Sequence, residues 1–268
     1  MSVLEPQTAT SLTLVPDHQG ATPCVALLEA DPDLAAHVEI EQRARAQAIV
    51  STPVLDLAVG PWDRGSLAGV GDRTFGAVVL SGLITRHLDV GGHPGLEFYG
   101  PGDVIGAWDL EIATLPAQES WTATVPSRLA LLDDRFLAAV RRWPRLLTGL
   151  FQRTRVQHDR LALQLVIAEQ PRVDERLLSL FWHLSERFGH VTPDGIVLSL
   201  ALTHEALGRL IGARRPTVTL ALKALADRDA VVRMPDRSWV VRERPQGLRP
   251  TEAGLSTRAQ PVPLARPS

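Results

Sequence analysis

Cysteine, lysine and long apolar runs are scarce in this chain, and each absence narrows what the protein can be. Cys24 is the single cysteine among 268 residues, which excludes an internal disulfide and the several cysteine ligands of an iron–sulfur cluster or a structural zinc site. No apolar run approaches the roughly 20 residues of a membrane-spanning helix, so no membrane association is expected. The opening residues, MSVLEPQTAT, lack the basic head and apolar stretch of a secretory signal. The sequence therefore predicts a cytoplasmic protein.

Charge is distributed unevenly, although the formal net charge is only −2. Residues 1–60 carry eight acidic side chains against Arg43 and Arg45, whereas residues 203–244 carry nine basic side chains against five acidic ones. The basic C-terminal stretch is the better candidate to meet phosphate. Lys223 is the one lysine among 28 basic residues, so the preference for arginine extends over the whole chain and carries no functional information.

The N-terminal half changes from helical to β-type patterning. Residues 1 to about 30 lack sustained periodicity, and DPDLAAHVEIEQRARAQA, from Asp31 to Ala48, favours an amphipathic surface helix. Between about Pro53 and Asp133, short β-branched runs alternate with glycine, which predicts the strands of an antiparallel sandwich or roll. GGHPG lies between two of these runs and predicts a hairpin turn, because glycine tolerates positive φ.

A helix of about 25 residues is predicted between Pro144 and Pro171, after a short helix over DRFLAAVRRW. Its apolar positions recur every three to four residues, at Leu146, Leu150, Leu161, Leu165 and Ala168. A helix of this length with one apolar seam suits the interface of a homodimer. The alternative left open is that the seam packs only against the chain's own roll.

The C-terminal third has the element order of a winged helix-turn-helix. The apolar-striped helix DERLLSLFWHLSERFG is followed by a turn and strand, by two helices with a glycine-bearing turn between them, and by a hairpin over VVRMPDRSWVVRER. From Pro245 onward five prolines and no periodicity predict a disordered tail. The predicted segments are a leader and N-terminal helix (1–48), the roll (49–142), the dimerisation helix (143–170), the winged helix-turn-helix (171–245) and the tail (246–268).

The helix-turn-helix, LTHEALGRLIGARRPTVTLALKAL, is the most specific motif in the sequence. Thr203 stands at the N-cap position of its first helix, Gly212 permits the tight turn, and Pro216 suits the first turn of its second helix. Buried positions are expected at Leu207, Leu210, Ile211, Val218, Ala221, Leu222 and Leu225. The residues left around the exposed N-terminal end of the second helix, which enters the major groove in such motifs, are Arg214, Arg215, Thr217 and Thr219.

The residue types at that end suit double-stranded DNA. Arginine can bond guanine bidentately, while threonine hydroxyls and free helix amides suit phosphate. Arg233 and Arg237, in or beside the hairpin, are candidates for flanking phosphates. Two arginines at a helix start can also be a solvated charge cluster, but the turn glycine, the helix spacing and the basic wing together favour contact with DNA.

The helix-turn-helix motif resembles that of the CRP/FNR superfamily of bacterial transcription regulators, and the likeness extends over about residues 50–245. GLEFYGPGDVIG is similar to a segment of the family's roll in which a Pro-Gly-Asp turn precedes Ile-Gly. The resemblance implies an α+β fold: an antiparallel, jelly-roll-like β-roll sensor domain similar to cyclic-nucleotide-binding domains, a long dimerisation helix and a C-terminal winged helix-turn-helix. It implies partners as well, namely double-stranded DNA and a second copy of the chain, with RNA polymerase left open.

The resemblance also assigns roles within the helix-turn-helix. It implies base reading by Arg215 and phosphate contacts from Thr203, Arg214 and Thr217. Pro216 and Leu220 replace the glutamate and the second arginine with which cAMP-responsive members read bases, so a different operator is expected. A homodimer implies a palindromic operator, with recognition helices in successive major grooves about 34 Å apart.

The predicted effector site departs from that of the cAMP-responsive members. Gly106 remains, but Trp108 and Asp109 follow it, and Glu119 and Ser120 occupy the region where the phosphate-binding arginine is expected. A carboxylate repels phosphate, so cyclic-nucleotide binding in the usual manner is not expected. No cofactor is predicted. An unknown small-molecule effector remains open, as does a haem or small apolar ligand, with candidate histidines His87, His93 and His158.

Two rival functions compete with the regulator. An enzyme would need a cupin-like metal site of His87, His93 and Glu97, which lacks the usual His-X-His pairing, and no nucleophile elbow, Walker loop or dinucleotide fingerprint occurs. We therefore predict no enzyme and no metal site. The second rival is a signalling or scaffold protein that keeps the roll without binding DNA, which the basic and hydroxylated second helix argues against.

Overall fold

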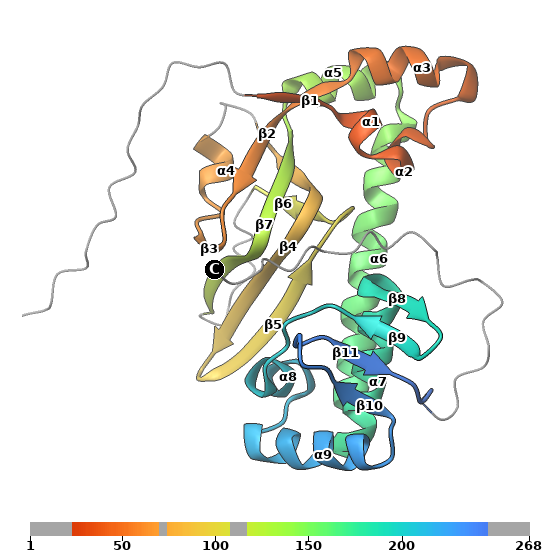
Figure 1. The fold of residues 1–268 in the computed structure, drawn as a ribbon. Helices are drawn as coiled ribbons and strands as arrows, with labels where there is room; N and C mark the ends of the chain where they lie inside the picture. Colours follow the sequence, from red (N-terminus) through yellow and green to blue (C-terminus); the bar gives the residue numbers. More distant parts are fainter. Residues whose placement is uncertain (1–22, 70–73, 108–116, 246–268) are drawn as a thin grey trace, which may run out of the picture.

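The computed structural model describes residues 23–69, 74–107 and 117–245 and shows a β-roll, a long helix and a smaller α/β domain (Figure 1). The first elements are β1 (Cys24–Ala26), α1 (Leu27–Ala30), α2 (Pro32–Ala35) and α3 (Ile40–Ile49). The roll comprises β2 (Ser51–Leu57), β3 (Gly60–Trp62), α4 (Ser66–Gly69), β4 (Gly76–Val90), β5 (His93–Tyr99), β6 (Val104–Gly106) and β7 (Gln118–Leu132). The helices α5 (Asp134–Arg142) and α6 (Arg145–Ala168) follow.

The C-terminal domain comprises α7 (Val173–Phe188), β8 (Gly189–Thr192), β9 (Gly195–Leu198), α8 (His204–Ile211), α9 (Arg215–Asp227), β10 (Val231–Arg233) and β11 (Trp239–Val241). The predicted α+β class, with an antiparallel roll, a long helix and a winged helix-turn-helix, is confirmed. Most of the predicted leader and the predicted tail over residues 246–268 lie outside the described residues. The exact segment boundaries stay predictions.

The roll is a single antiparallel sheet that curls around its own core. Its strands lie in the order β1-β2-β7-β4-β5, with β3 paired to β7 and β6 paired to β4. The pairing of β4 with β7 shifts register at three places between Val79 and Ile84. Such bulges bend and twist a strand, which allows the two 15-residue strands to curve over the interior (Figure 1). That interior is packed with apolar side chains, including Ile84, Tyr99 and Leu129.

The hairpin predicted at GGHPG is confirmed, and its turn contains fewer residues than the motif suggested. Val90 pairs with His93, so the loop between β4 and β5 contains only Gly91 and Gly92. Their φ angles are 60° and 81°, as a type I′ turn requires. The remaining residues of the motif belong to β5, because cross-strand hydrogen bonding continues to the turn.

We expect Gly82→Ala to lower the free energy of unfolding by about 2–4 kcal/mol. Gly82 has φ 96°, and an added Cβ would lie 2.5 Å from the Cα of Ser127 on β7. Gly91→Ala is the matched control, since its φ is 60° and nothing lies within 4 Å of an added Cβ. In the control, the free energy of unfolding should fall only by the conformational cost of a side chain at positive φ, about 1–2 kcal/mol. Urea denaturation measures both, and equal losses would contradict a tight contact at Ser127.

The N-terminal segment is more structured than its sequence suggested. The single helix predicted over residues 31–48 is instead two, α2 and α3, because the chain turns after Ala35 to place Val38 in the core. Asp31 begins α2 as its N-cap, accepting a hydrogen bond from the Leu34 amide at 3.0 Å. Before it, β1 adds to the edge of the sheet, and Leu27 and Leu28 are fully buried. Adjacent leucines in so short a helix create no periodicity for sequence reasoning to detect.

The long helix α6 spans residues 145–168 and connects the N-terminal helices to the C-terminal domain (Figure 1). Leu146 and Leu150, two residues of the predicted seam, are buried in this chain against the N-terminal helices and α5. Leu161 and Leu165 remain exposed. No helix in the described part of the chain is both long and apolar enough to cross a membrane.

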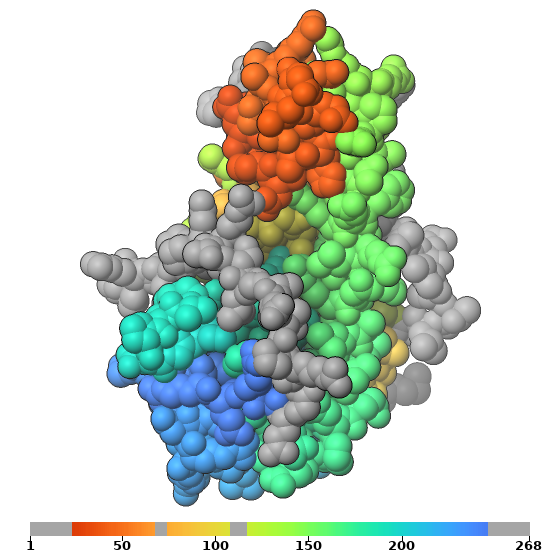
Figure 2. All heavy atoms as spheres, turned by 90° about the vertical axis from the view of Figure 1, so that its right-hand side faces the viewer, coloured from red at the N-terminus to blue at the C-terminus, as the bar shows by residue number. Residues whose placement is uncertain are grey.

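An outward-facing row of α6 side chains keeps Leu161 and Leu165 of the predicted seam but has Leu147 and Phe151 in place of Leu146 and Leu150. We call it the α6 stripe; it consists of Leu147, Phe151, Thr154, His158, Leu161 and Leu165, all exposed. The 4-3-4-3-4 spacing is that of a coiled-coil seam. Figure 2 shows α6 as the green surface that runs along this side of the molecule, between the N-terminal helices and the C-terminal domain.

The C-terminal domain carries its own four-stranded sheet, in the order β10-β11-β9-β8. The segment predicted as a turn and strand is therefore the hairpin β8–β9. Phe181 of α7 packs on Trp239 of β11 with ring centroids 4.9 Å apart. The same apolar core includes Leu83 and Leu96 of the roll, so the two domains share a packed boundary.

Polar contacts reinforce that boundary. Asp103 of the roll is buried and pairs with Arg187 of α7 and, at 3.3 Å, with Arg160 of α6. Arg209 of α8 lies with its Nη1 atom 3.1 Å from Nδ1 of His87 on β4. The orientation of the helix-turn-helix in this conformation is thus set by contacts with the roll as well as by α6.

Candidate nucleic-acid interface

The helix-turn-helix is formed by α8 and α9, and its local geometry follows the sequence closely. The Thr203 side chain caps α8 by accepting a hydrogen bond from the Ala206 amide at 3.0 Å. Gly212 ends α8 in the left-handed conformation, with φ 66° and ψ 36°. Pro216 lies in the first turn of α9. All seven predicted buried positions are buried: Leu207, Leu210, Ile211, Val218, Ala221, Leu222 and Leu225.

The structure places every predicted contact residue on the surface. They are Thr203, Arg214, Arg215, Thr217, Thr219, Arg233 and Arg237, and all are exposed. They come from the start of α8, the start of α9 and the β10–β11 hairpin. In Figure 1, α9 lies at the end of the molecule furthest from the N-terminal helices, with no part of the roll drawn over its outer side.

The arginines of this domain divide into those with carboxylate partners and those without. Arg209 pairs with Glu205, Arg228 pairs with Asp174 and Glu243, and Arg242 pairs with Asp229. Within the described residues, no ion pair involves the remaining basic side chains of this surface: Arg214, Arg215, Lys223, Arg233 and Arg237. The cations of α9 and the wing therefore stay available to an anion, and a cluster of such charges is the electrostatic footprint of a phosphate-binding surface.

His204, which sequence reasoning did not select, connects the two helices at this surface. Its Nδ1 atom lies 2.9 Å from the Thr219 hydroxyl, which in turn donates to the Arg215 carbonyl at 3.0 Å. Partial burial and the guanidinium groups of Arg233 and Arg215 lower the pKa of His204. The Thr219 hydroxyl is thus engaged within α9. The guanidinium groups of Arg233 and Arg215 also make the potential around His204 more positive, as an anion-binding surface requires.

The wing holds its two arginines in different ways. Arg233 ends β10 and lies over the ring of Trp239, 5.4 Å from the centroid. Arg237 adopts φ 69° in the turn, and its amide donates to the Met234 carbonyl at 3.0 Å. The Asp236 side chain accepts from the amide and hydroxyl of Ser238. Because backbone and side-chain bonds order this turn, both arginines project from a defined hairpin.

The comparisons with known proteins agree with this geometry. A family model for the Crp-like helix-turn-helix domain matches residues 175–250. A CRP-like cAMP-activated global transcriptional regulator of Mycobacterium tuberculosis is 30% identical over 201 residues, which cover 71% of this chain and 81% of that protein. This chain belongs to the CRP/FNR family. It is therefore a DNA-binding transcription regulator by family, and the family is not one of enzymes.

Solved structures of other proteins have the same fold as this CRP/FNR regulator. A CooA mutant from Carboxydothermus hydrogenoformans matches with a TM-score of 0.56 and 15% identity, covering 72% of this chain and 84% of that one. FixK2 from Bradyrhizobium japonicum matches with a TM-score of 0.52 and 16% identity, covering 72% and 93%. At these identities the likeness establishes the arrangement of roll, long helix and winged helix and nothing finer.

Charged side chains occupy the inner face of the roll beside Gly106. Arg64, from the loop after β3, donates to the Gly106 carbonyl at 2.9 Å and pairs with Glu119 at 3.2 Å. Arg86 pairs with Glu119 at 2.6 Å. Both guanidinium groups lie under 6 Å from the ring centre of Trp121. Arginines are thus present where the sequence motif lacked one, but both already pair with Glu119, and Arg86 also pairs with Glu97 at 3.5 Å. Trp108, Asp109 and the rest of residues 108–116 lie outside the described residues.

The candidate metal site of His87, His93 and Glu97 does not form. His87 pairs in register with Leu96, and Glu97 is the next residue of β5, so His87 and Glu97 point to opposite faces of the sheet. Among residues 23–69, 74–107 and 117–245, no group of three or more His, Cys, Asp or Glu side chains could hold a metal ion. His93 is exposed at the start of β5.

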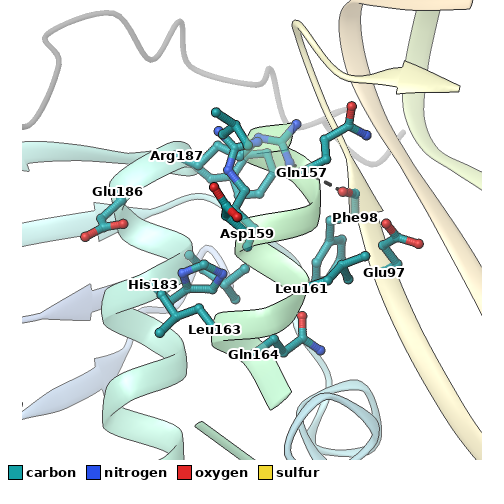
Figure 3. A pocket seen from close by; sticks show the side chains of 14 residues that line it. Glu97, Phe98, Gln157, Asp159, Leu161, Leu163, Gln164, His183, Glu186 and Arg187 are labelled. Atoms are coloured by element: carbon teal, nitrogen blue, oxygen red, sulfur yellow. Dashed lines mark hydrogen bonds between the residues drawn. The ribbon is translucent and has the colours of Figure 1, made fainter. Parts of the chain in front are cut away.

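A cavity of about 410 Å³ lies between β5, α6 and α7 (Figure 3). Its apolar lining includes Phe98, Leu163 and Phe188. His183 of α7 faces it, with a buried Nδ1 atom that bonds to none of the described residues. Burial, and then the guanidinium groups of Arg160 and Arg187, lower the pKa of His183 below its ordinary 6.5.

The lowered pKa predicts that the protein loses stability as the solution becomes acidic. Below about pH 6.5 the unfolded chain binds a proton that folded His183 resists, so the free energy of unfolding should fall as the pH decreases from 7.5 to 5.5. Urea denaturation at both values measures this loss. In His183→Gln the loss should be smaller, whereas exposed His190→Gln should leave it unchanged. The same loss in His183→Gln as in the wild type would contradict the assignment.

Proposed function

We propose that this CRP/FNR regulator binds a palindromic operator as a homodimer in the cytoplasm. The cluster of cations on α9 and the wing, which have no carboxylate partners among the described residues, is the observation that carries DNA binding. Arg214 and Arg215 lie at the N-terminal end of α9, where free backbone amides and the positive end of the helix dipole also favour phosphate. Arg215 is the candidate base reader, and Thr203, Arg214, Thr217, Arg233 and Arg237 are candidate phosphate contacts.

The α6 stripe supports the homodimer. Phe151 is 68% exposed and Leu165 is 70% exposed, and the heptad spacing of the stripe lets two copies pack with their side chains interleaved. A two-fold axis along α6 would present two α9 helices to one duplex. Two-fold symmetry makes the operator palindromic, and its half-sites should lie about 34 Å apart, the distance between successive major grooves on one side of B-DNA.

We also propose that regulation uses an effector other than cAMP. The relative from Mycobacterium tuberculosis is named as cAMP-activated. In this chain, by contrast, Glu119 holds both Arg64 and Arg86 at the inner face of the roll. A cyclic phosphate would have to compete with that carboxylate for the same guanidinium groups, at a cost in desolvation and lost ion pairs.

Selection of bound sequences from a random duplex pool tests these proposals. The full chain should enrich an inverted repeat, and its affinity for that repeat should fall steeply with salt, because phosphate contacts release counterions. Added cAMP should change neither the enriched sequence nor the affinity. No enrichment at low salt would overturn DNA binding in favour of a scaffold role, and a single half-site would overturn the dimer.

A further inference from the structure

Leu220 occupies the centre of the outward face of α9. The buried face of the helix is formed by Val218, Ala221, Leu222 and Leu225. At about 100° per residue, the direction opposite these four passes close to Pro216, Leu220 and Lys223. Leu220 is 71% exposed, more than any other large apolar side chain of the described C-terminal domain.

The surroundings of Leu220 distinguish it from a protein-docking patch. The neighbouring outward positions hold the polar residues Thr217 and Lys223 and the small apolar residues Pro216 and Ala224, all of them exposed. An apolar surface that binds another protein usually extends over several hundred square ångströms, whereas Leu220 is the single exposed large apolar side chain of α9. Its place suits a narrow apolar contact inside a groove that is otherwise polar.

The major groove offers one such contact. Among the base edges exposed there, only thymine presents an apolar group, its 5-methyl. We propose that Leu220 reads a thymine in each half-site by packing on that methyl group, an inference that rests on the proposed binding of α9 in the major groove. Cytosine and the purines would leave the leucine against polar edges, which disfavours them at this position.

Deoxyuridine tests the inference, because it lacks only the 5-methyl group of thymidine. Each thymine of the selected operator is replaced in turn by deoxyuridine, in both half-sites together, and the Kd is measured at fixed salt. At one position this replacement should weaken wild-type binding about fourfold per half-site, which corresponds to the free energy of burying one methyl group. Leu220→Ala should bind the two duplexes equally. Lys223→Ala is the matched control: it should bind every duplex more weakly while still distinguishing thymidine from deoxyuridine.

The possible outcomes separate this inference from the proposed function. Equal wild-type affinity for all thymidine and deoxyuridine duplexes would overturn the role of Leu220 and leave DNA binding intact. The same preference in Leu220→Ala as in the wild type would also overturn it. A failure to select any operator would overturn both proposals. Leu220 is exposed and alanine favours helices, so the variant should keep its circular dichroism spectrum, and a loss of that spectrum would contradict the outward placement.

Discussion

Replacing Phe151 and Leu161 together with glutamate is expected to convert the dimer into monomers and to weaken operator binding at least about a hundredfold. The two residues lie in the α6 stripe, where a two-fold axis would bring each glutamate close to its counterpart. Four charges would then be buried in an apolar seam without partners, which is far more costly than the lost apolar contact. Each monomer would keep one helix-turn-helix and lose the advantage of binding two half-sites at once.

Light scattering and operator affinity should change together in that variant. The monomer fold should persist, since Phe151 and Leu161 are 68% and 38% exposed within one chain. Gln152→Glu is the matched control, because Gln152 is exposed on α6 but lies outside the stripe; it should remain dimeric and bind normally. A double variant that stays dimeric would place the interface elsewhere. A monomer that binds the full operator as tightly as the wild type would remove the need for a dimer.

The second large effect is expected from Arg215→Ala, which should weaken binding to the selected operator by about 1–3 kcal/mol, or roughly five- to 150-fold. Arg215 is exposed at the first position of α9 and has no carboxylate partner among the described residues. A guanidinium group at this position can bond guanine through two parallel hydrogen bonds. Its removal should therefore reduce the preference for the operator over a scrambled duplex.

Arg214→Ala provides the contrast, because a phosphate contact does not depend on sequence. It should weaken operator and scrambled duplex by similar factors and reduce the dependence of affinity on salt. Arg45→Ala, which removes the same charge from exposed α3, should change neither. If Arg215→Ala weakened all duplexes equally, Arg215 would be a phosphate contact, and base reading would have to come from other residues of α9.

Much of the helix-turn-helix could be predicted because its determinants are local. The cap at Thr203, the left-handed Gly212, Pro216 in the first turn and the buried positions of α8 and α9 all act within about 25 residues of chain. Capping bonds and the 3.6-residue period depend on neighbours in the sequence, so the sequence is sufficient to locate them. The hairpin at Gly91 and Gly92 is predictable for the same reason.

Predictions that depended on distant packing were less accurate. Two of the five residues assigned to the seam on α6, Leu146 and Leu150, are buried against N-terminal helices that begin more than 100 residues earlier. Leu147 and Phe151 take their place on the outside. Helical periodicity identifies apolar positions, but it does not tell which of two apolar faces packs within the chain.

The sequence by itself determined the family and the position of the helix-turn-helix, since each follows from local pattern and motif. The tertiary structure decided which charges are available. Arg228 is neutralised by Asp174, 54 residues away in the chain, and Arg64 meets Glu119 across 55 residues. Arg214 and Arg215 meet no carboxylate among the described residues. Ion pairing depends on distance in space, and folding alone brings those partners together or keeps them apart.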